Sequence, residues 1–415
     1  MTHLLFAAIV FFVILEFAID QTLSFLNQKA AYGPLPKEAQ GIYSDEKRAE
    51  SQRYLTAKYK LGLFSATVST LLMLAALYFQ WFAWLDSFVR DRTSNSFLIS
   101  LSFIAIASVA SSLASLPFGI YGTFVLEERF GFNKTTPKLF IIDLIKGAAL
   151  GAVIGGAILS VILWLYETLA GTFWIAAWAV VAIFSIIMFM FGTSVILPLF
   201  NKVKPLEAGP LRTEIEKYCA SQGYSLRRLF VMDASKRSTK ANAFFSGLGK
   251  SKTIVLFDTL IAKLDTKETV AVLAHEVGHY KLKHTLRMFI SSNIQSFAIF
   301  FLLGQLLGNE KLSQALGVAT PSFHISALAF FLLLTPINTI LGLINNSLTR
   351  RDEHSADIYA AKTYSGTAIK SGLKKISTDS LSNLSPHPLY VAFNYSHPPL
   401  TQRMNHVDAF AKGSQ

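Results

Sequence analysis

Seven long apolar stretches constrain the fold of this chain more than any other feature. They lie at about residues 4–26, 62–88, 97–123, 139–166, 173–200, 287–308 and 325–348. About 20 apolar residues suffice for a helix to cross the hydrocarbon core of a bilayer. Because backbone polar groups in lipid must be satisfied within their own segment, these stretches predict seven membrane-spanning helices. The first stretch could be a cleaved signal peptide. We interpret it as a membrane span instead, because no Lys or Arg precedes it and Glu16 and Asp20 interrupt it.

The composition supports a multi-pass membrane protein. Of the 415 residues, 52% are hydrophobic and only 15% are charged, against about 25% charged in soluble domains. The net charge of +12 suits cytoplasmic loops and anionic lipid head groups, so we expect membrane lipids and no nucleic acid as partners. A single cysteine, Cys219, excludes an internal disulfide and a cysteine-rich zinc site. We expect a monomer.

Lys and Arg alternate between the predicted loops, and this alternation predicts the orientation. Loops 27–61 and 124–138 carry seven and three, whereas loops 89–96, 167–172 and 309–324 carry two, none and one. The basic segments 201–286 and 349–415 fall on the same side as the basic loops. The positive-inside rule therefore predicts a cytoplasmic location for both segments and an external N-terminus.

The expected fold class is a mainly α membrane protein with a small α+β domain outside the membrane. The expected division is five spans in 1–200, a first domain part in 201–286, a hairpin of spans in 287–348 and a second domain part in 349–415. Within the first part, the pattern predicts a helix at 210–222, strands at 229–232, 241–246 and 253–257, a turn at 247–252 and a helix from 267. In the spans, Gly147, Gly151 and Gly155 predict close helix contacts.

A metal-binding pattern stands at the end of the first domain part. His275 and His279 are four residues apart, so on a helix over 266–285 both imidazoles leave one face and can bind one metal ion. Glu276 lies about 100° round the helix and can reach a metal-bound water without being a ligand. Gly278 costs roughly 1 kcal/mol in a helix, which indicates close approach of another backbone.

A catalytic zinc site needs a third protein ligand and an open position. After the last span, Glu353 and Asp357 share a helix face at i, i+4. One carboxylate can bind metal while the other orients a histidine, and Glu353 is preferred to His354 as the ligand. The other histidines, His284, His324, His387 and His406, match no ligand spacing and are expected at the surface or in packing.

The order of several motifs resembles the type I CAAX prenyl proteases, integral-membrane zinc endopeptidases of the gluzincin group. The matching stretches are FGFNK (130–134), PLFNK (198–202), SKRS (235–238), ANAF (241–244), IVLFDTL (254–260), HEVGH (275–279), EHSAD (353–357) and SHPP (396–399). The resemblance as a whole extends over about residues 30–403. One departure is His354-Ser355, where the family often has an aromatic residue or Gln.

The resemblance implies a zincin-like domain, one Zn²⁺ per chain and a peptide or protein substrate that can be prenylated. It implies that the zinc ligands are His275, His279 and Glu353, with Glu276 as general base and His397 as stabiliser of the oxyanion. It implies Asp357 as the partner of His275 and Arg403 as a support of the His397 region. An edge strand carrying Asn242, Ala243 and Phe244 would pair with the substrate.

Two other function classes stay open at this stage. A heat-shock-type membrane zinc protease shares the gluzincin core but has fewer spans, and a transporter could carry a structural metal site. The predicted reaction is peptide hydrolysis by zinc-activated water. The short loops favour a bacterial inner membrane over the endoplasmic reticulum, with the active site on the cytoplasmic side.

Overall fold

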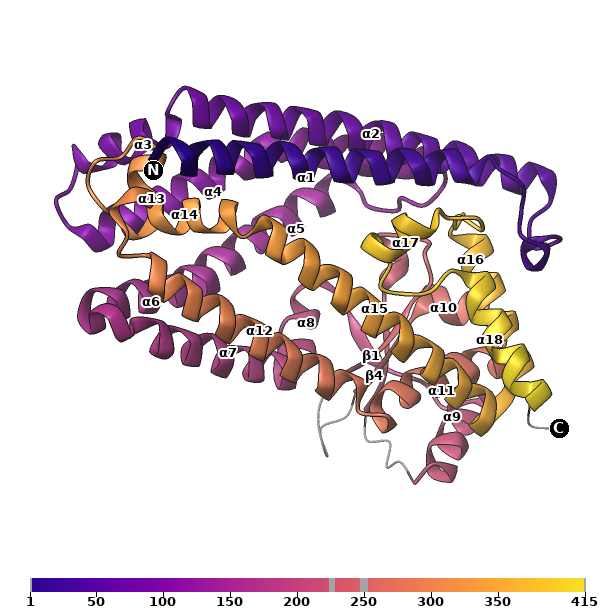
Figure 1. Ribbon diagram of the computed structural model, residues 1–415. Helices are drawn as coiled ribbons and strands as arrows, with labels where there is room; N and C mark the ends of the chain where they lie inside the picture. The colour runs from indigo at the N-terminus through magenta and orange to yellow at the C-terminus, as the bar shows by residue number, and fades with distance from the viewer. Residues whose placement is uncertain (1, 224–227, 247–252, 414–415) are drawn as a thin grey trace.

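The computed structural model describes residues 2–223, 228–246 and 253–413. Long helices run side by side through one half of the molecule, and a smaller domain with a sheet occupies the other half (Figure 1). The N-terminus lies at the end remote from this domain, beside α3 and α13, whereas the C-terminus lies within it. The helices of the first half are α1 (Thr2–Ala31), α2 (Asp45–Tyr78), α3 (Trp81–Arg90), α4 (Ser96–Tyr121), α5 (Pro137–Leu150), α6 (Gly156–Leu169), α7 (Phe173–Val195), α8 (Leu197–Phe200), α12 (His284–Leu306), α13 (Glu310–Ala315) and α14 (Phe323–Leu333).

The described residues contain five helical runs that are long and apolar enough to cross a membrane, or six if one bent pair counts as a span. One run, Pro137–Phe200, has 64 residues, far more than the roughly 20 that a span requires. It folds back near Ala170–Thr172, so that α6 packs against α7 and the run contains both the fourth and the fifth predicted stretches. The prediction of a multi-pass membrane protein is confirmed with five or more spanning helices, while the exact number of seven stays a prediction.

The seventh predicted stretch is not one continuous helix. It is divided between α14 and α15 (Thr335–Ala360), which meet at an angle of 54°. Pro336 lies in the first turn of α15, where its missing N–H leaves no helix hydrogen bond unmade. α15 then continues without interruption into the smaller domain. One helix therefore carries both the second part of the apolar stretch and Glu353.

A four-stranded sheet with the order β1-β2-β4-β3 forms the centre of the smaller domain. Its strands are β1 (Val203–Pro205), β2 (Arg228–Met232), β3 (Ala243–Ser246) and β4 (Thr253–Phe257). β3 pairs antiparallel with β4, which confirms the predicted hairpin, and leaves β3 at the edge. The predicted turn at 247–252 lies outside the described residues. The surrounding helices are α9 (Pro210–Ser221), α10 (Asp258–Lys263), α11 (Thr266–Lys281), α16 (Gly366–Asp379), α17 (Pro388–Asn394) and α18 (Leu400–Gly413).

Two expectations about helices are wrong. The helix expected over 266–285 is two helices, because Lys283 adopts a left-handed conformation at φ +59° and α12 begins at His284. The close contacts expected at Gly147, Gly151 and Gly155 are missing, since a Cβ added at any of the three would meet no atom of the described chain within 4 Å.

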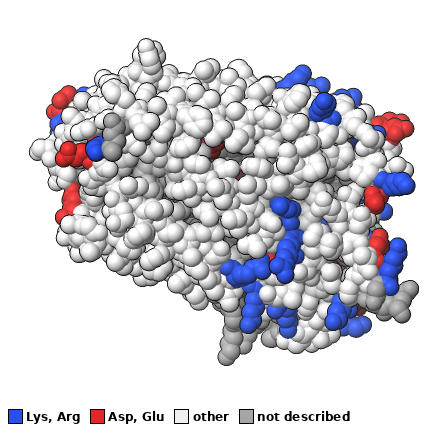
Figure 2. Space-filling model, in the orientation of Figure 1, with Lys and Arg blue, Asp and Glu red and all other residues white. Residues whose placement is uncertain are grey.

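Lys and Arg side chains gather over the half that contains the smaller domain. Figure 2 shows a broad surface without Lys, Arg, Asp or Glu over the long helices, and most of the Lys and Arg of this face over α15 and the smaller domain. This separation agrees with an uncharged belt in the bilayer and a basic domain outside it.

Candidate metal centre

Helices α11 and α15 carry the site and pack directly against each other. α11 begins with a capping box, in which the side chains of Asp265 and Glu268 each accept from the other's backbone N–H. At Gly278, an added Cβ would lie 3.1 Å from Cβ of Tyr359 and 3.3 Å from Cα of Ala356. The expected close approach at this glycine is therefore confirmed, and it brings α15 against the histidine face of α11.

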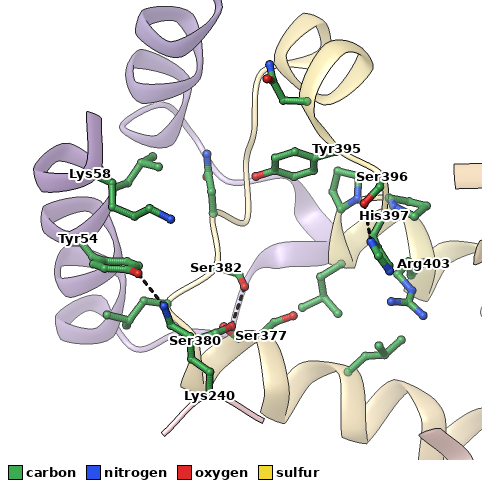
Figure 3. Close-up of a pocket in the computed structure, with 18 residues that line it drawn as sticks. Tyr54, Lys58, Lys240, Ser377, Ser380, Ser382, Tyr395, Ser396, His397 and Arg403 are labelled. Atoms are coloured by element: carbon green, nitrogen blue, oxygen red, sulfur yellow. Dashed lines mark hydrogen bonds between the residues drawn. The ribbon is translucent and has the colours of Figure 1, made fainter. Parts of the chain in front are cut away.

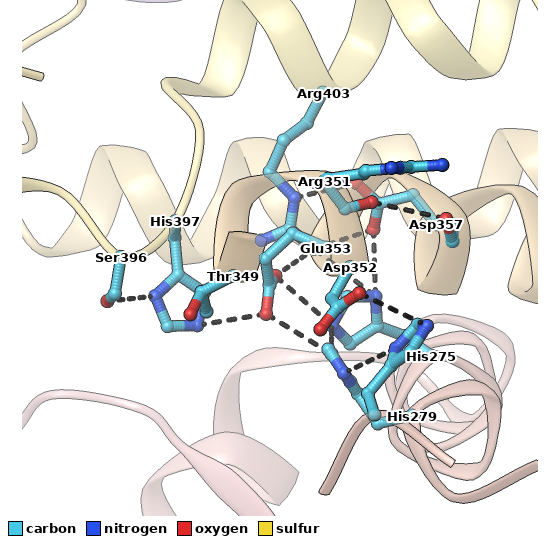
Figure 4. Close-up of polar contacts among 12 residues, drawn as sticks. His275, His279, Thr349, Arg351, Asp352, Glu353, Asp357, Ser396, His397 and Arg403 are labelled. Carbon is cyan, nitrogen blue, oxygen red and sulfur yellow. Dashed lines mark hydrogen bonds and ion pairs between the residues drawn. The ribbon is translucent and has the colours of Figure 1, made fainter. Parts of the chain in front are cut away.

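Three side chains from these helices converge on one point (Figure 4). The Nε2 atoms of His275 and His279 are 3.1 Å apart, and they lie 3.4 Å and 3.1 Å from the carboxylate oxygens of Glu353. One ligand atom from each residue falls within 4.8 Å of the others. Ligands about 2.0–2.2 Å from a tetrahedral zinc ion lie about 3.3–3.6 Å from each other. The buried Glu353 Oε2 has no hydrogen-bond partner among the described residues, so the set fits a divalent cation.

His275 is held from behind by a buried ion pair. Its Nδ1 lies 2.8 Å from Asp357 Oδ1, and Arg403 donates to both oxygens of Asp357 at 2.6 and 2.7 Å. Burial alone would lower the pKa of His275, but hydrogen bonds to Asp357 and Glu353 outweigh it and raise this pKa to about 9. With Nδ1 engaged by Asp357, Nε2 is directed at the shared point. Arg403, expected to support the His397 region, binds Asp357 and lies 3.5 Å from Glu353, which His397 also contacts.

His279 has a different partner, which the sequence did not reveal. Its Nδ1 lies 3.2 Å from Nδ1 of the buried His284, whose Nε2 lies 3.4 Å from Asp352 Oδ1. Arg287 donates to the other oxygen of Asp352. The spacing of five residues between His279 and His284 is not a helix-face spacing. Only the break at Lys283 turns His284 back onto His279.

Glu276 and His397 lie beside the cluster, Glu276 with an unpaired carboxylate and His397 with an exposed ring. Glu276 makes no hydrogen bond or ion pair with any described residue, and burial raises its pKa. His397 has Nε2 3.3 Å from Glu353 Oε1 and Nδ1 2.9 Å from Ser396 Oγ, and its side chain is 62% exposed. One face of the cluster is therefore open to a ligand.

In the strand expected to bind substrate, the side chains of Asn242, Ala243 and Phe244 are engaged within the protein, and the backbone lies at the edge of the sheet. Asn242 precedes the edge strand β3, and its Oδ1 accepts from the N–H of Ala243 at 2.8 Å. The side chain of Ala243 is buried, and the ring of Phe244 packs against Phe257.

The rival third ligand, His354, does not belong to the cluster. Its ring stacks on that of His406 at a centroid distance of 3.8 Å. Glu353 lies near the Nε2 atoms of both histidines, whereas Asp357 of the same motif contacts only Nδ1 of His275, on the side away from the shared point.

Comparison with known proteins agrees with this arrangement. Residues 25–202 match the family model "CAAX prenyl protease N-terminal, five membrane helices", and residues 205–411 match "Peptidase family M48". The CAAX prenyl protease 1 homolog of Arabidopsis thaliana is 35% identical, over 96% of both chains. CAAX prenyl protease 1 of Saccharomyces cerevisiae is 33% identical, over 96% of this chain and 94% of its own.

A solved structure gives the same result for the fold. The crystal structure of S. mikatae Ste24p superposes with a TM-score of 0.92 at 33% identity, covering 97% of this chain and 99% of that one. The match to five membrane helices ahead of the peptidase unit excludes the transporter and the heat-shock-type alternatives. The chain belongs to the CAAX prenyl protease family of M48 peptidases and is a multi-pass membrane metalloendopeptidase.

Proposed function

We propose that this enzyme holds one zinc ion and hydrolyses peptide bonds near the C-terminus of prenylated CAAX-type or other membrane-associated peptides. The observation that carries the proposal is the convergence of His275, His279 and Glu353 beside the unpaired carboxylate of Glu276. The names of the relatives support the CAAX class of substrate. His275, His279 and Glu353 would hold the metal, with Asp357 orienting His275.

Zinc bound there would supply Lewis-acid chemistry toward water and the substrate carbonyl. Glu276 accepts the proton of the attacking water on its carboxylate and then delivers it to the nitrogen of the leaving amine. His397, on the open face, donates from Nε2 toward the oxygen that becomes negative in the transition state. The free edge of β3 after Asn242 offers backbone groups to an extended substrate, which aligns the scissile bond.

The proposal places the site on the cytoplasmic side of the membrane, with lipids around the apolar belt and a monomer as the working unit. The gathering of Lys and Arg over the domain that holds the cluster supports this orientation (Figure 2). The preference for a bacterial inner membrane stays a prediction from the short loops, since the relatives named above come from eukaryotes.

The test is cleavage by the full-length enzyme in nanodiscs. A farnesylated peptide and its unmodified twin are incubated with wild type, Glu276→Gln and the control Glu207→Gln, which lies in an exposed segment of the smaller domain. We expect Glu276→Gln to retain zinc while its kcat falls by a factor of about 10²–10⁴. The kcat of Glu207→Gln should equal that of the wild type. Cleavage by zinc-loaded Glu276→Gln at the wild-type rate would reject the proposed mechanism.

A further inference from the structure

A cavity of about 540 Å³ adjoins the metal cluster. Figure 3 shows Lys58 and Tyr54 of α2 on one side of it and His397 and Arg403 on the other. Because His397 Nε2 is 3.3 Å from Glu353 Oε1, this second side borders the ligand set. A volume in the range of about 300–1,000 Å³ is typical of ligand sites and accommodates a short peptide segment. A substrate cut at the cluster can therefore extend one end into the cavity.

The cavity has a net positive wall. Three basic side chains line it, those of Lys58, Lys240 and Arg403, and no Asp or Glu of the described residues does. Two of the three cations are already paired. Arg403 binds Asp357, and Lys240 donates to Glu127 at 2.7 Å and to the hydroxyl of Tyr54 at 3.0 Å.

Lys58 is the cation without a counterion. Its Nζ lies 5.4 Å from the centroid of the Tyr54 ring and makes no hydrogen bond or ion pair with any described residue. Lys58 is exposed, so water hydrates its ammonium group in the empty cavity. A peptide that displaces this water would leave the three donors of the ammonium group without partners beside Lys240, which is unfavourable. An anionic group on the bound peptide would remove that cost.

We propose that this cavity binds the last residues of the substrate and that Lys58 pairs with the free C-terminal carboxylate. Lys58 is then a specificity residue, and the distance between Lys58 and the metal cluster sets how far from the chain end the enzyme cuts. An internal segment of a longer chain would displace water from the ammonium group of Lys58 without supplying an anion, which disfavours binding of that segment. This inference rests on the proposed peptide hydrolysis at the cluster and adds to it the requirement for a chain end.

Two peptides that differ only at the C-terminus provide the test, one with a free carboxylate and one with a carboxamide. Both are cleaved by the zinc-loaded full-length enzyme in nanodiscs of neutral lipid. We expect the carboxamide to lower kcat/KM at least about tenfold, mainly through KM, because the lost ion pair is present in both the ground and the transition state. Lys58→Met should lower kcat/KM of the carboxylate peptide to that of the carboxamide and leave the carboxamide unchanged. Lys58→Arg should retain the preference.

Lys60→Met is the matched control, since Lys60 is exposed on the same helix and does not line the cavity. Equal cleavage of both peptides by wild type would overturn the inference while leaving the hydrolysis intact, whereas absence of Glu276-dependent cleavage of either would overturn the proposed function itself. An equal loss of cleavage of both peptides in Lys58→Met would show that Lys58 has a structural role, and this result would also overturn the inference. Inhibition by phosphatidylserine nanodiscs that disappears in Lys58→Met would assign Lys58 to a lipid phosphate instead. If Lys58→Met fails to fold, the comparison of the two peptides with the wild-type enzyme still tests whether the free carboxylate is recognised.

Discussion

At the scale of single residues, the two histidines of the metal pair are held by unlike partners. His275 rests on a charged pair, Asp357 and Arg403, whereas His279 rests on a second imidazole, that of His284. Partners behind a metal-binding histidine fix its ring and its tautomer, and their removal typically costs about 10–100-fold in metal affinity. Both partners are therefore expected to affect zinc retention.

His284→Ala tests the less familiar of the two partners. Loss of the His284 ring frees Nδ1 of His279, so we expect zinc affinity to fall about tenfold or more, measured by competition with a chromophoric chelator. His406→Ala is the matched control, because His406 stacks on His354 away from the cluster. Equal zinc retention in the two variants would contradict a role for His284 in positioning His279.

The pKa of His275 predicts a pH dependence of zinc binding. This pKa is raised from its ordinary 6.5 to about 9, so the protonated ring stabilises the zinc-free fold fully below pH 6.5 and loses that contribution as the pH rises through 9. Zinc must displace this proton, and its affinity should therefore fall about tenfold per pH unit below 9. Calorimetry of zinc binding at pH 7.5, in buffers of different ionisation enthalpy, should show that one proton is released from His275. A binding enthalpy that does not depend on the buffer would refute this proton release.

At the scale of elements, the contact between α11 and α15 aligns the third ligand with the histidine pair. Gly278→Ala gains helix propensity of about 1 kcal/mol but forces a Cβ against Tyr359 and Ala356, and overpacking of this kind costs about 1–3 kcal/mol. We expect a lower unfolding temperature and weaker zinc retention, since α15 must shift and carries Glu353 with it. Gly147→Ala, where the added methyl meets nothing within 4 Å, should leave both quantities unchanged or raise the unfolding temperature. A fully stable, zinc-retaining Gly278→Ala would contradict the tight contact.

Which elements could be predicted from sequence follows from how local their causes are. The spanning helices follow from hydropathy, and the ligand pair follows from the i, i+4 spacing of His275 and His279. The break at Lys283 has no glycine or proline to announce it. The bend between α14 and α15 coincides with Pro336, a signal that hydropathy alone does not register. The contact of Arg403 with Asp357 joins residues 46 apart in sequence, so it could not be derived from helix spacing.

At the scale of the whole molecule, the distribution of charge predicts which end of the protein faces the cytoplasm. The native Cys219 is fully buried, so a membrane-impermeant maleimide should report only on introduced cysteines. Ser94→Cys lies in the exposed turn between α3 and α4, at the end remote from the sheet domain, and Glu207→Cys lies in that domain. In intact cells we expect labelling of Ser94→Cys at once and of Glu207→Cys only after permeabilisation, because the basic domain stays inside. The reverse pattern would place the metal cluster outside the cytoplasm and reject the proposed orientation, while equal labelling in intact cells would show that the membrane was not sealed to the reagent.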